Sequence, residues 1–518
     1  MTRISTNPNK IYESISLPAN SKNTFDKTHP VMMTGQIGEL APCLVMPVHP
    51  GDNVYLDATM LIRFPALISP AMARFDASIH YFYVPNRVVW PGFDEWFAGE
   101  DGYSMPTLTI DTTIGVDNER LLDQMGIPPI MNSVGQNDLD ISALPFAAFQ
   151  KIYNDYYRPR PFEDEVFYQI TQFGGPIDPL LYDEILSRRK RSWQHDYFTS
   201  MLPEPLVAPE VNVGINISLV DDWQDIGQPF WAQYGGLPNA DGAVLQSAGI
   251  NQVNTTSIPP LQPSAYSPDG TLTGETTVNT LREAYARMRY LEKMGRSGGE
   301  YYEIIMALYG ERIPDARLQR AEYITGIKIP VNINPVLATA ESEAGPLAQQ
   351  GGHMVAAGDG GGKSFHAPEH GYVIGIWSIL PQPYYTQGVN RHFRAFDRED
   401  FIIPDMANIG EQGVMSYELT AYEEDQDELT TLGYMPNYTH YKQMYGRIAG
   451  EFRTSLASYA IVKDYNGVPA LNKEFIQVEP NIADHIFVAD AAITDPCWIN
   501  ILHGIQHTMS LPVYSDPV

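Results

Sequence analysis

Strand patterns at both ends of the chain constrain its fold more than any other feature. Over residues 54–64 every second residue is apolar, and polar residues such as Asp57 and Arg63 stand between them. This period-two alternation is typical of a strand with one buried face. The same alternation returns over residues 75–83, after a short connection. We therefore expect two neighbouring strands near the start of the chain.

The second half of the chain contains further strand patterns. Residues 371–380, GYVIGIWSIL, are apolar at odd and even positions, as expected for a strand covered on both faces. Residues 486–493 and 498–509 predict additional strands. Because strands lie at both ends, we expect the middle to be inserted into one structure and not to follow it. Residues 1–518 are thus predicted to form a single domain with an all-β core.

Helices are expected in the middle of the chain. Thr280 and Glu283 have the spacing of a capping box, and apolar residues follow them at helical spacing. A second short helix is predicted over residues 301–309, so that 276–325 form a helical insertion. A further helix is predicted over 146–157.

Two other stretches of the middle predict loops. No Lys or Arg occurs between Arg191 and Arg282, and this part is rich in Pro, Gly, Asn and Thr. We interpret residues 205–275 as an inserted surface protrusion that does not face phosphates. Apolar residues within it, including Trp223, Phe230 and Trp231, indicate that it packs on itself or on symmetry mates. The glycine-rich stretch 351–362 is expected to be a flexible loop.

Charge and cysteine content exclude several classes of protein. The 518 residues include 33 Lys and Arg against 62 Asp and Glu, a net charge of -29. A chain with this balance does not bind nucleic acid through bulk positive charge. With only Cys43 and Cys497, neither a disulfide framework nor a zinc finger is expected. No secretory signal and no apolar run of about 20 residues is present, so we expect no membrane insertion.

Two motifs suggest catalysis or metal binding, but neither lies in the secondary structure that its function requires. Residues 295–299, GRSGG, match the nucleophile elbow around Ser297, but a predicted helix precedes them where that motif needs a strand. His366 and His370 have helical spacing, but Pro368 breaks any helix between them. We expect no catalytic residue, metal ligand or cofactor. Core or interface positions are the expectation for His485, His503 and His507.

The scarce basic residues form clusters that suggest a binding surface. Aromatic residues such as Trp193, Tyr285 and Tyr290 lie among them, a mixture that is used to bind single-stranded nucleic acid. The alternative is that these cations pair with carboxylates across subunit interfaces. Both readings stay open for Arg188, Arg189, Lys190, Arg191, Arg282, Arg287, Arg289, Arg317 and Arg320.

Several sequence blocks resemble one family when taken in order. They are VPNRVVW at 84–90, the basic run 188–191 followed by HDYFTS at 195–200, PDARLQR at 314–320, and EHGYVIG at 369–375. This series is similar to the major capsid protein of microviruses, particularly the gokushovirus branch. The resemblance extends from about residue 25 to the end, except over 205–275.

The resemblance implies an eight-stranded viral jelly roll with long loop and helical insertions. It also implies a T=1 icosahedral shell of sixty subunits around circular single-stranded DNA, assembled in the cytoplasm of a host bacterium. The expected partners are other copies, the packaged DNA, a small basic DNA-packaging protein, internal scaffolding and DNA-pilot proteins, and the host surface. The protrusion with Trp223, Phe230 and Trp231 is the expected host-facing part.

A jelly-roll protein that binds or cleaves glycans is the alternative, because that fold also hosts lectins and hydrolases. A glycosidase needs a cleft with two paired carboxylates, and the sequence indicates no specific pair. We therefore expect a structural protein and not an enzyme. Particle size separates the two hypotheses, since a shell protein forms closed particles.

Overall fold

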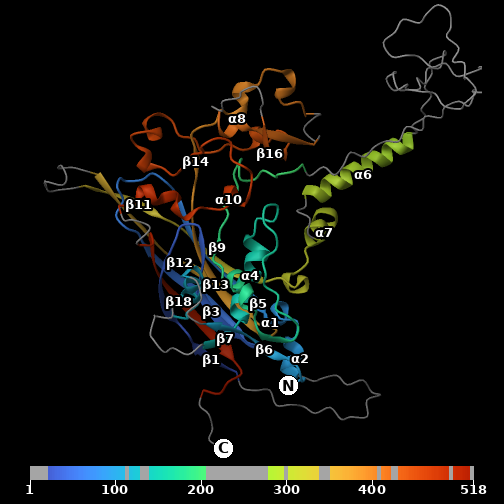
Figure 1. The fold of residues 1–518 in the computed structure, drawn as a ribbon, viewed down its shortest axis with the longest axis vertical. Helices are drawn as coiled ribbons and strands as arrows, with labels where there is room; N and C mark the ends of the chain where they lie inside the picture. The colour runs from blue at the N-terminus through green and yellow to red at the C-terminus, as the bar shows by residue number, and fades with distance from the viewer. Residues whose placement is uncertain are drawn as a thin grey trace, which may run out of the picture. The chain divides into compact units, whose positions relative to one another are not determined.

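The computed structural model describes the chain in nine stretches and divides it into two units. The described residues are 22–110, 116–128, 139–205, 278–296, 301–337, 350–404, 410–421, 430–488 and 494–513. One unit comprises Met1–Leu206 and Tyr301–Val518, and the other comprises Val207–Glu300. The first unit contains two large β-sheets (Figure 1).

The first sheet joins strands from both ends of the chain. Its strand order is β1-β18-β4-β12-β11, and β2 also pairs with β18. Along β4 and β18 every second side chain is buried, which confirms the period-two patterns of the sequence. The strands are β1 (Asn23–Asp26), β2 (His29–Gly35), β4 (Asn53–Arg63), β11 (Asn332–Leu337), β12 (Gln350–His366) and β18 (Cys497–Met509).

The second sheet has the strand order β10-β5-β13-β3-β9. Its central strand β13 is buried along most of its length, as its continuous apolar sequence predicts. The strands are β3 (Glu39–Val48), β5 (Phe75–Pro85), β9 (Arg189–Lys190), β10 (Glu322–Pro330) and β13 (Gly371–Pro381).

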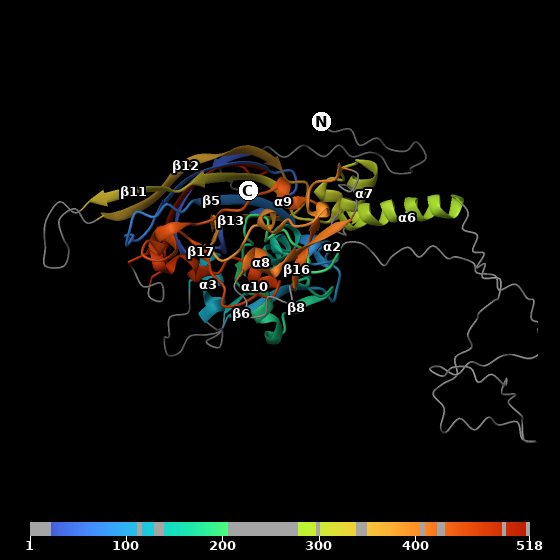
Figure 2. The same cartoon turned by 90° about the horizontal axis from the view of Figure 1, so that it is seen from above.

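One hydrophobic core lies between the two sheets. Leu56 and Ile501 enter it from the first sheet, and Tyr81 and Trp377 enter it from the second. Figure 2 shows β11 and β12 layered above β5 and β13. The strands from the start and the end of the chain therefore share one core, as their patterns indicate.

Helices cover the outer face of the second sheet. Phe82 and Ile374 point to this side and pack with Phe146 and Phe149 of α4 in a second core. The predicted helix over 146–157 is confirmed, with its last five residues in π-helical form. The elements of this layer are α1 (Asn86–Val89), α2 (Phe93–Ala98), β6 (Ser104–Ile110), α3 (Val116–Gln124), β7 (Leu139–Ser142), α4 (Leu144–Ile152), η1 (Tyr153–Tyr157), β8 (Gly174–Pro176), η2 (Pro179–Leu181) and α5 (Tyr182–Ile185).

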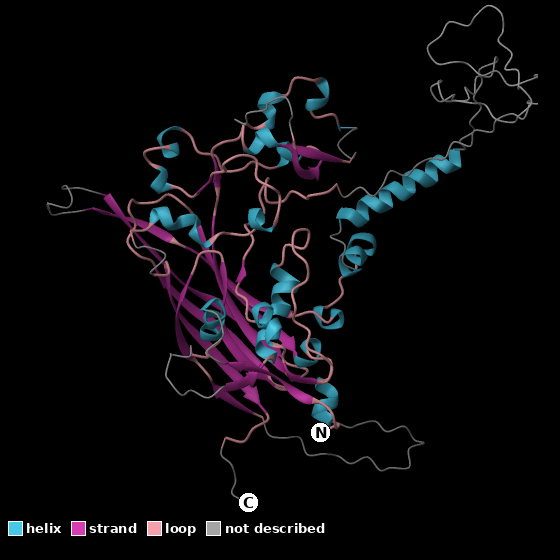
Figure 3. Cartoon of the chain, in the orientation of Figure 1, coloured by secondary structure: helices cyan, strands magenta, loops and turns pink. Residues whose placement is uncertain are grey.

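The chain between β13 and β18 forms a layer of short elements and loops (Figure 3). A third core holds this layer to the HDYFTS segment, with Tyr197 and Phe198 packed against Tyr385, Val414 and Phe475. Its elements are β14 (Tyr384–Tyr385), η4 (Arg391–Arg394), η5 (Arg398–Asp400), β15 (Glu411–Met415), α8 (Ser416–Leu419), β16 (Thr431–Pro436), α9 (Thr439–Lys442), η7 (Gly450–Arg453), η8 (Ala457–Tyr459), β17 (Val462–Lys463), α10 (Lys473–Ile476) and η9 (Pro480–Ile486).

Two expectations from the sequence are wrong. The stretch 351–362 is not a loop but part of β12, where its glycines permit close packing. A Cβ atom on Gly352 would lie only 2.7 Å from Leu67 Cδ1. A strand was expected over 486–493, but Ile486 is the last residue of the 3₁₀ helix η9. Residues 489–493 lie outside the described residues.

The predicted helices of the middle are present. In the second unit α6 spans Val278–Arg296, beginning two residues before Thr280, and its described side chains are exposed or half-buried. In the first unit α7 spans Tyr301–Tyr309, followed by the short helix η3 (Asp315–Leu318). Across the described stretches no helix has both the length and the apolar character needed to cross a membrane.

Candidate functional site

The basic run 188–191 lies at the edge of the second sheet. Arg189 and Lys190 form β9, which pairs with Glu39 and Leu40 of β3. Arg188 Nη1 lies 3.5 Å from the buried Glu39 carboxylate. Three residues of the run therefore contact β3 directly, and backbone and side-chain contacts fix the run to the sandwich.

Arg191 is the most enclosed member of the run. Its Nη1 donates to Ser78 Oγ and Ser378 Oγ, at 2.6 Å each, and its guanidinium lies over the Tyr157 ring. Burial lowers the pKa of Arg191, and burial together with the Arg191 charge lowers the pKa of His80 to about 4. This guanidinium connects neighbouring strands β5 and β13 at the centre of the sheet.

Arg189 also contacts groups within the chain, whereas Lys190 is exposed. Arg189 Nε donates to Gln150 Oε1 at 2.7 Å, and its guanidinium lies 5.3 Å from the centre of the Tyr153 ring. The side chain of Lys190 points away from the core and is exposed. Within this run, Lys190 is the residue whose charge reaches solvent most freely.

The second group of predicted basic residues is divided between the two units. Arg282, Arg287 and Arg289 are exposed on α6. In the first unit Arg317 is exposed. Arg320 Nη2 donates to the Asp155 carbonyl at 2.6 Å, and the Arg320 guanidinium lies over two tyrosine rings. The three aromatic residues of the predicted protrusion, Trp223, Phe230 and Trp231, lie outside the described residues.

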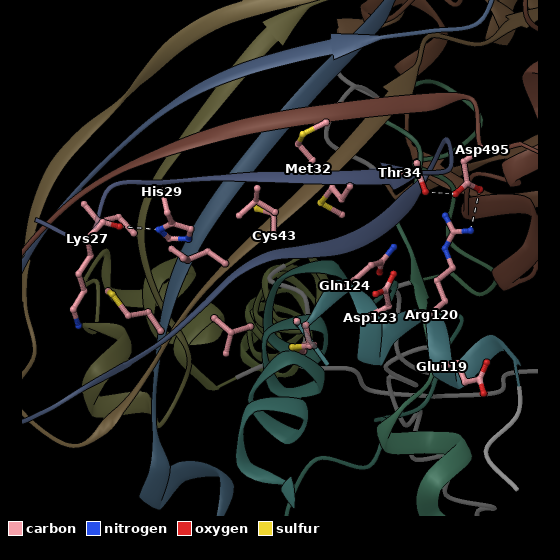
Figure 4. A pocket seen from close by; sticks show the side chains of 18 residues that line it. Lys27, His29, Met32, Thr34, Cys43, Glu119, Arg120, Asp123, Gln124 and Asp495 are labelled. Atoms are coloured by element: carbon pink, nitrogen blue, oxygen red, sulfur yellow. Dashed lines mark hydrogen bonds and ion pairs between the residues drawn. The ribbon is translucent and has the colours of Figure 1, made fainter. Parts of the chain in front are cut away.

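A hollow of about 850 Å³ opens between the edges of β2 and β3 (Figure 4). Methionines from both strands and from the residue that follows α3 line it, together with Cys43. Lys27 and His29 lie at one end, and Arg120 and Asp495 lie at the other. Among the described residues no strand pairs with the free edge of β2.

The polar end of the hollow is a salt-bridge network. Arg120 lies 2.9 Å from both Glu39 and Asp495, and Thr34 Oγ1 donates to Asp495 at 2.6 Å. Burial acts to raise the pKa of Asp495, but hydrogen bonds from Arg120 and Thr34 lower it overall. Asp495 is therefore held as a carboxylate, a state suited to binding Arg120 and not to donating a proton. The sequence gives no signal for this network, because its members are far apart in the chain.

The hollow offers a binding surface more than a reactive centre. Burial raises the pKa of Cys43, so its thiol stays protonated at neutral pH and is a poor nucleophile. Within the described stretches no three His, Cys, Asp or Glu side chains are grouped so that they could hold a metal ion. Methionine side chains adapt their shape readily, which suits an apolar contact surface.

Two histidines of β18 are buried core residues, as the sequence predicts. His503 bonds to the Tyr81 hydroxyl at 2.8 Å and to the Cys43 carbonyl at 3.1 Å. His507 Nε2 lies 2.9 Å from Asp52, a residue of the turn before β4. Burial lowers the pKa of His503 to about 4. The third histidine, His485, lies in η9 and bonds to the Ala460 carbonyl.

Sequence comparison identifies the family of this two-sheet protein. Residues 16–518 match the family described as capsid protein (F protein). The chain belongs to the F protein family of capsid proteins. The match covers nearly all of the sequence.

Three F protein relatives come from phages and a virus of different hosts. The chain is 30% identical to capsid protein VP1 of Bdellovibrio phage phiMH2K, with 88% of each chain covered. It is 26% identical to capsid protein VP1 of Chlamydia phage 1, covering 96% of this chain and 95% of the relative. It is also 26% identical to capsid protein VP1 of Spiroplasma virus 4, with 94% of each covered. The resemblance to microvirus capsid proteins is confirmed.

Proposed function

We propose that this chain is the major capsid protein of a virion in which sixty copies form a T=1 shell around circular single-stranded DNA. The observation that carries the proposal is the F protein match from residue 16 to residue 518. A capsid family implies self-assembly, and a structural role accounts for a large sandwich with long loop insertions.

Strand pairing supports an eight-stranded jelly roll. Taking β2, β3, β4, β5, β10, β12, β13 and β18 in chain order, the first pairs with the last and the second with the seventh. The third pairs with the sixth, and the fourth with the fifth. Four nested antiparallel pairs of this kind arise when one long hairpin is rolled into two facing sheets. The remaining strands of each sheet are additions at its edges.

The exposed basic residues are the candidates for contact with DNA or with neighbouring subunits. They are Lys190, Arg282, Arg287, Arg289 and Arg317. In contrast, Arg188, Arg189, Arg191 and Arg320 contact groups of the same chain. With a charge of -29 on each copy, most of the cations that neutralise packaged DNA come from elsewhere. A small basic packaging protein would supply them, and scaffolding and DNA-pilot proteins are further expected partners.

The protrusion at 205–275 is proposed to lie on the outer surface and to meet the host. Its lack of Lys and Arg supports a position away from DNA. Deleting it tests this role if assembly and host adsorption are measured separately. Intact particles that no longer adsorb support recognition, whereas failure to assemble supports a role in joining subunits.

Particle formation tests the whole proposal. The full chain, produced in bacteria with its packaging partners, should yield closed particles of uniform size in negative-stain micrographs. Nuclease-resistant single-stranded DNA should co-purify with them. A protein that remains a monomer or small oligomer under all conditions, and that binds glycans, would contradict the proposal and support the lectin alternative.

A further inference from the structure

An exposed group of large apolar side chains lies in the layer between β13 and β18. We call it the aromatic patch and define it as Phe393, Phe396, Phe401, Ile402 and Tyr441. The exposed fraction of Phe396 is 79%, and that of Phe393 is 64%. Apolar side chains that gather at one place on a surface are a mark of an interaction site, whereas single exposed ones are common.

Hydrogen bonds hold the aromatic patch in shape. The Asp400 carboxylate accepts the backbone N–H groups of Phe396 and Asp397, at 2.9 Å each. The Tyr441 hydroxyl donates to the Asp400 carbonyl at 3.1 Å, which joins α9 to η5. These contacts hold the backbone at Phe396 and the ring of Tyr441 in place, so less backbone entropy is lost there when a partner binds.

Two of the three arginines beside the patch contact other groups of the same chain. The Arg391 side chain donates to the Gly413 carbonyl at 2.9 Å, and the Arg394 guanidinium lies 4.5 Å from the centre of the Tyr417 ring. Over residues 391–402 three arginines are balanced by three acidic residues. A single-strand binding platform combines aromatic rings with a positively charged groove. A segment without net charge favours a protein partner over DNA.

Electrostatics indicates which protein partner fits. Copies that each carry a charge of -29 repel one another, so they meet most easily where negative charge is locally absent. Most of the aromatic patch lies in the segment 391–402, where three arginines match three acidic residues in number, so this segment carries no net charge. Aromatic residues and arginine are also enriched in the cores of protein interfaces. We infer that the aromatic patch is a contact surface for a second copy of this chain, an inference that rests on the proposed assembly into a shell.

The Phe396→Asp variant tests the inference by placing a charge at the most exposed residue of the patch. Because Phe396 is exposed, the isolated subunit should keep its melting temperature. Its yield of particles, measured by sedimentation velocity, should fall by about tenfold or more. Leu180→Asp is the matched control, since Leu180 is 84% exposed on η2 in the other insertion. This control should assemble as the unchanged chain does.

Three other results would overturn the inference. Normal particle yield from Phe396→Asp would show that the patch is not needed for assembly. Particles that form normally but lose DNA, seen as a lower absorbance ratio at 260 to 280 nm, would assign the patch to nucleic acid. If the unchanged chain forms no particles at all, the proposed function fails first and the inference fails with it.

A cross-linking measurement covers the case in which Phe396→Asp fails to fold. Replacing Phe396 by the photoreactive analogue p-benzoylphenylalanine keeps an apolar ring at this position. Irradiation of assembled particles should yield covalent dimers of the chain on denaturing gels. Particles that give only cross-links within one chain would contradict the inference without affecting the proposed function.

Discussion

Arg191 was a candidate for binding because of its charge, but its side chain contacts residues inside the subunit. It lies where β5 and β13 run side by side. Its guanidinium donates hydrogen bonds to the hydroxyl oxygens of Ser78 and Ser378. A buried hydroxyl that loses its partner costs about 1–3 kcal/mol. The contribution of Arg191 to folding is therefore expected to exceed that of an exposed cation.

The Arg191→Ala variant should reduce the free energy of unfolding by about 2–3 kcal/mol, because two hydrogen bonds to a charged donor are lost. Urea unfolding of the isolated subunit measures this change. Lys190→Ala, one residue away but exposed, is the control and should stay within about 0.5 kcal/mol of the unchanged chain. Equal effects of the two substitutions would contradict an internal role for Arg191.

The buried His503 predicts a loss of stability in acid. Its pKa is about 4 in the folded chain, while an unfolded histidine has a pKa of about 6.5. Between these values the unfolded state binds a proton that the folded state does not. The stabilisation is thus complete above about pH 6.5 and is lost as the pH falls toward 4, by roughly 3 kcal/mol for this residue.

The His503→Gln variant should therefore have a weaker dependence of melting temperature on pH between about 6.5 and 4. Glutamine can still bond to Tyr81 and to the Cys43 carbonyl, but it does not titrate. His366→Gln, at an exposed position of β12, should leave the pH profile unchanged. If the melting temperature of His503→Gln falls with pH as steeply as that of the unchanged chain, this histidine is not a source of the acid sensitivity.

At the scale of elements, β12 packs closely because several of its residues lack side chains. A Cβ on Gly352 would meet the Ser69 carbonyl oxygen at 2.9 Å, whereas one on Gly351 would meet nothing closer than 3.7 Å. These neighbouring glycines therefore differ in the space around them while they share one strand. They form a natural pair for measuring what close packing contributes.

We expect Gly352→Ala to lower the free energy of unfolding by about 1–3 kcal/mol, since the backbone or Leu67 must move. Gly351→Ala should be neutral or slightly stabilising, because the added methyl group fits and the unfolded chain loses freedom. Denaturant unfolding of both variants tests the difference. If Gly351→Ala is the more harmful change, the packing around β12 differs from that described.

The strands that could be predicted from sequence are those with a buried and an exposed face. In β4 the alternation of side chains directly records the burial of every second residue. In β12 there are few side chains to alternate, so the same criterion predicted a loop. The apolar residues before 489 predicted a strand, but Ile486 instead ends a 3₁₀ helix and packs into the core.

The candidate site was predictable in its residue types but not in its contacts. The basic run was evident from composition, yet the partners of Arg191 are two serines separated by 300 positions. They become neighbours only because β5 pairs with β13. The aromatic patch had a visible signal in the alternation of arginine and phenylalanine over 391–396, but the sequence could not show that its rings are exposed.

At the scale of the whole molecule, the charge of -29 predicts that assembly depends on salt. Raising the ionic strength from 0.01 M to 0.15 M shortens the screening length from about 30 Å to about 8 Å, which reduces repulsion between copies. The subunit concentration needed for DNA-free assembly should therefore fall as salt increases, as measured by light scattering. If the subunit concentration needed for assembly instead rises with salt, attraction between opposite charges dominates the contacts between copies.

The position of β18 bears on when the chain can become folded during its synthesis. β18 lies between β2 and β4, and Thr34 contacts Asp495 across 461 residues of sequence. A ribosome that releases its product before Cys497 therefore leaves β1 and β2 without the strand on which both of them pair. Pairing over such separations is slow, and the open edges of β2 and β4 stay accessible until it is complete. Prematurely terminated chains thus lack a finished sandwich, and full translation becomes a condition for entry into any particle.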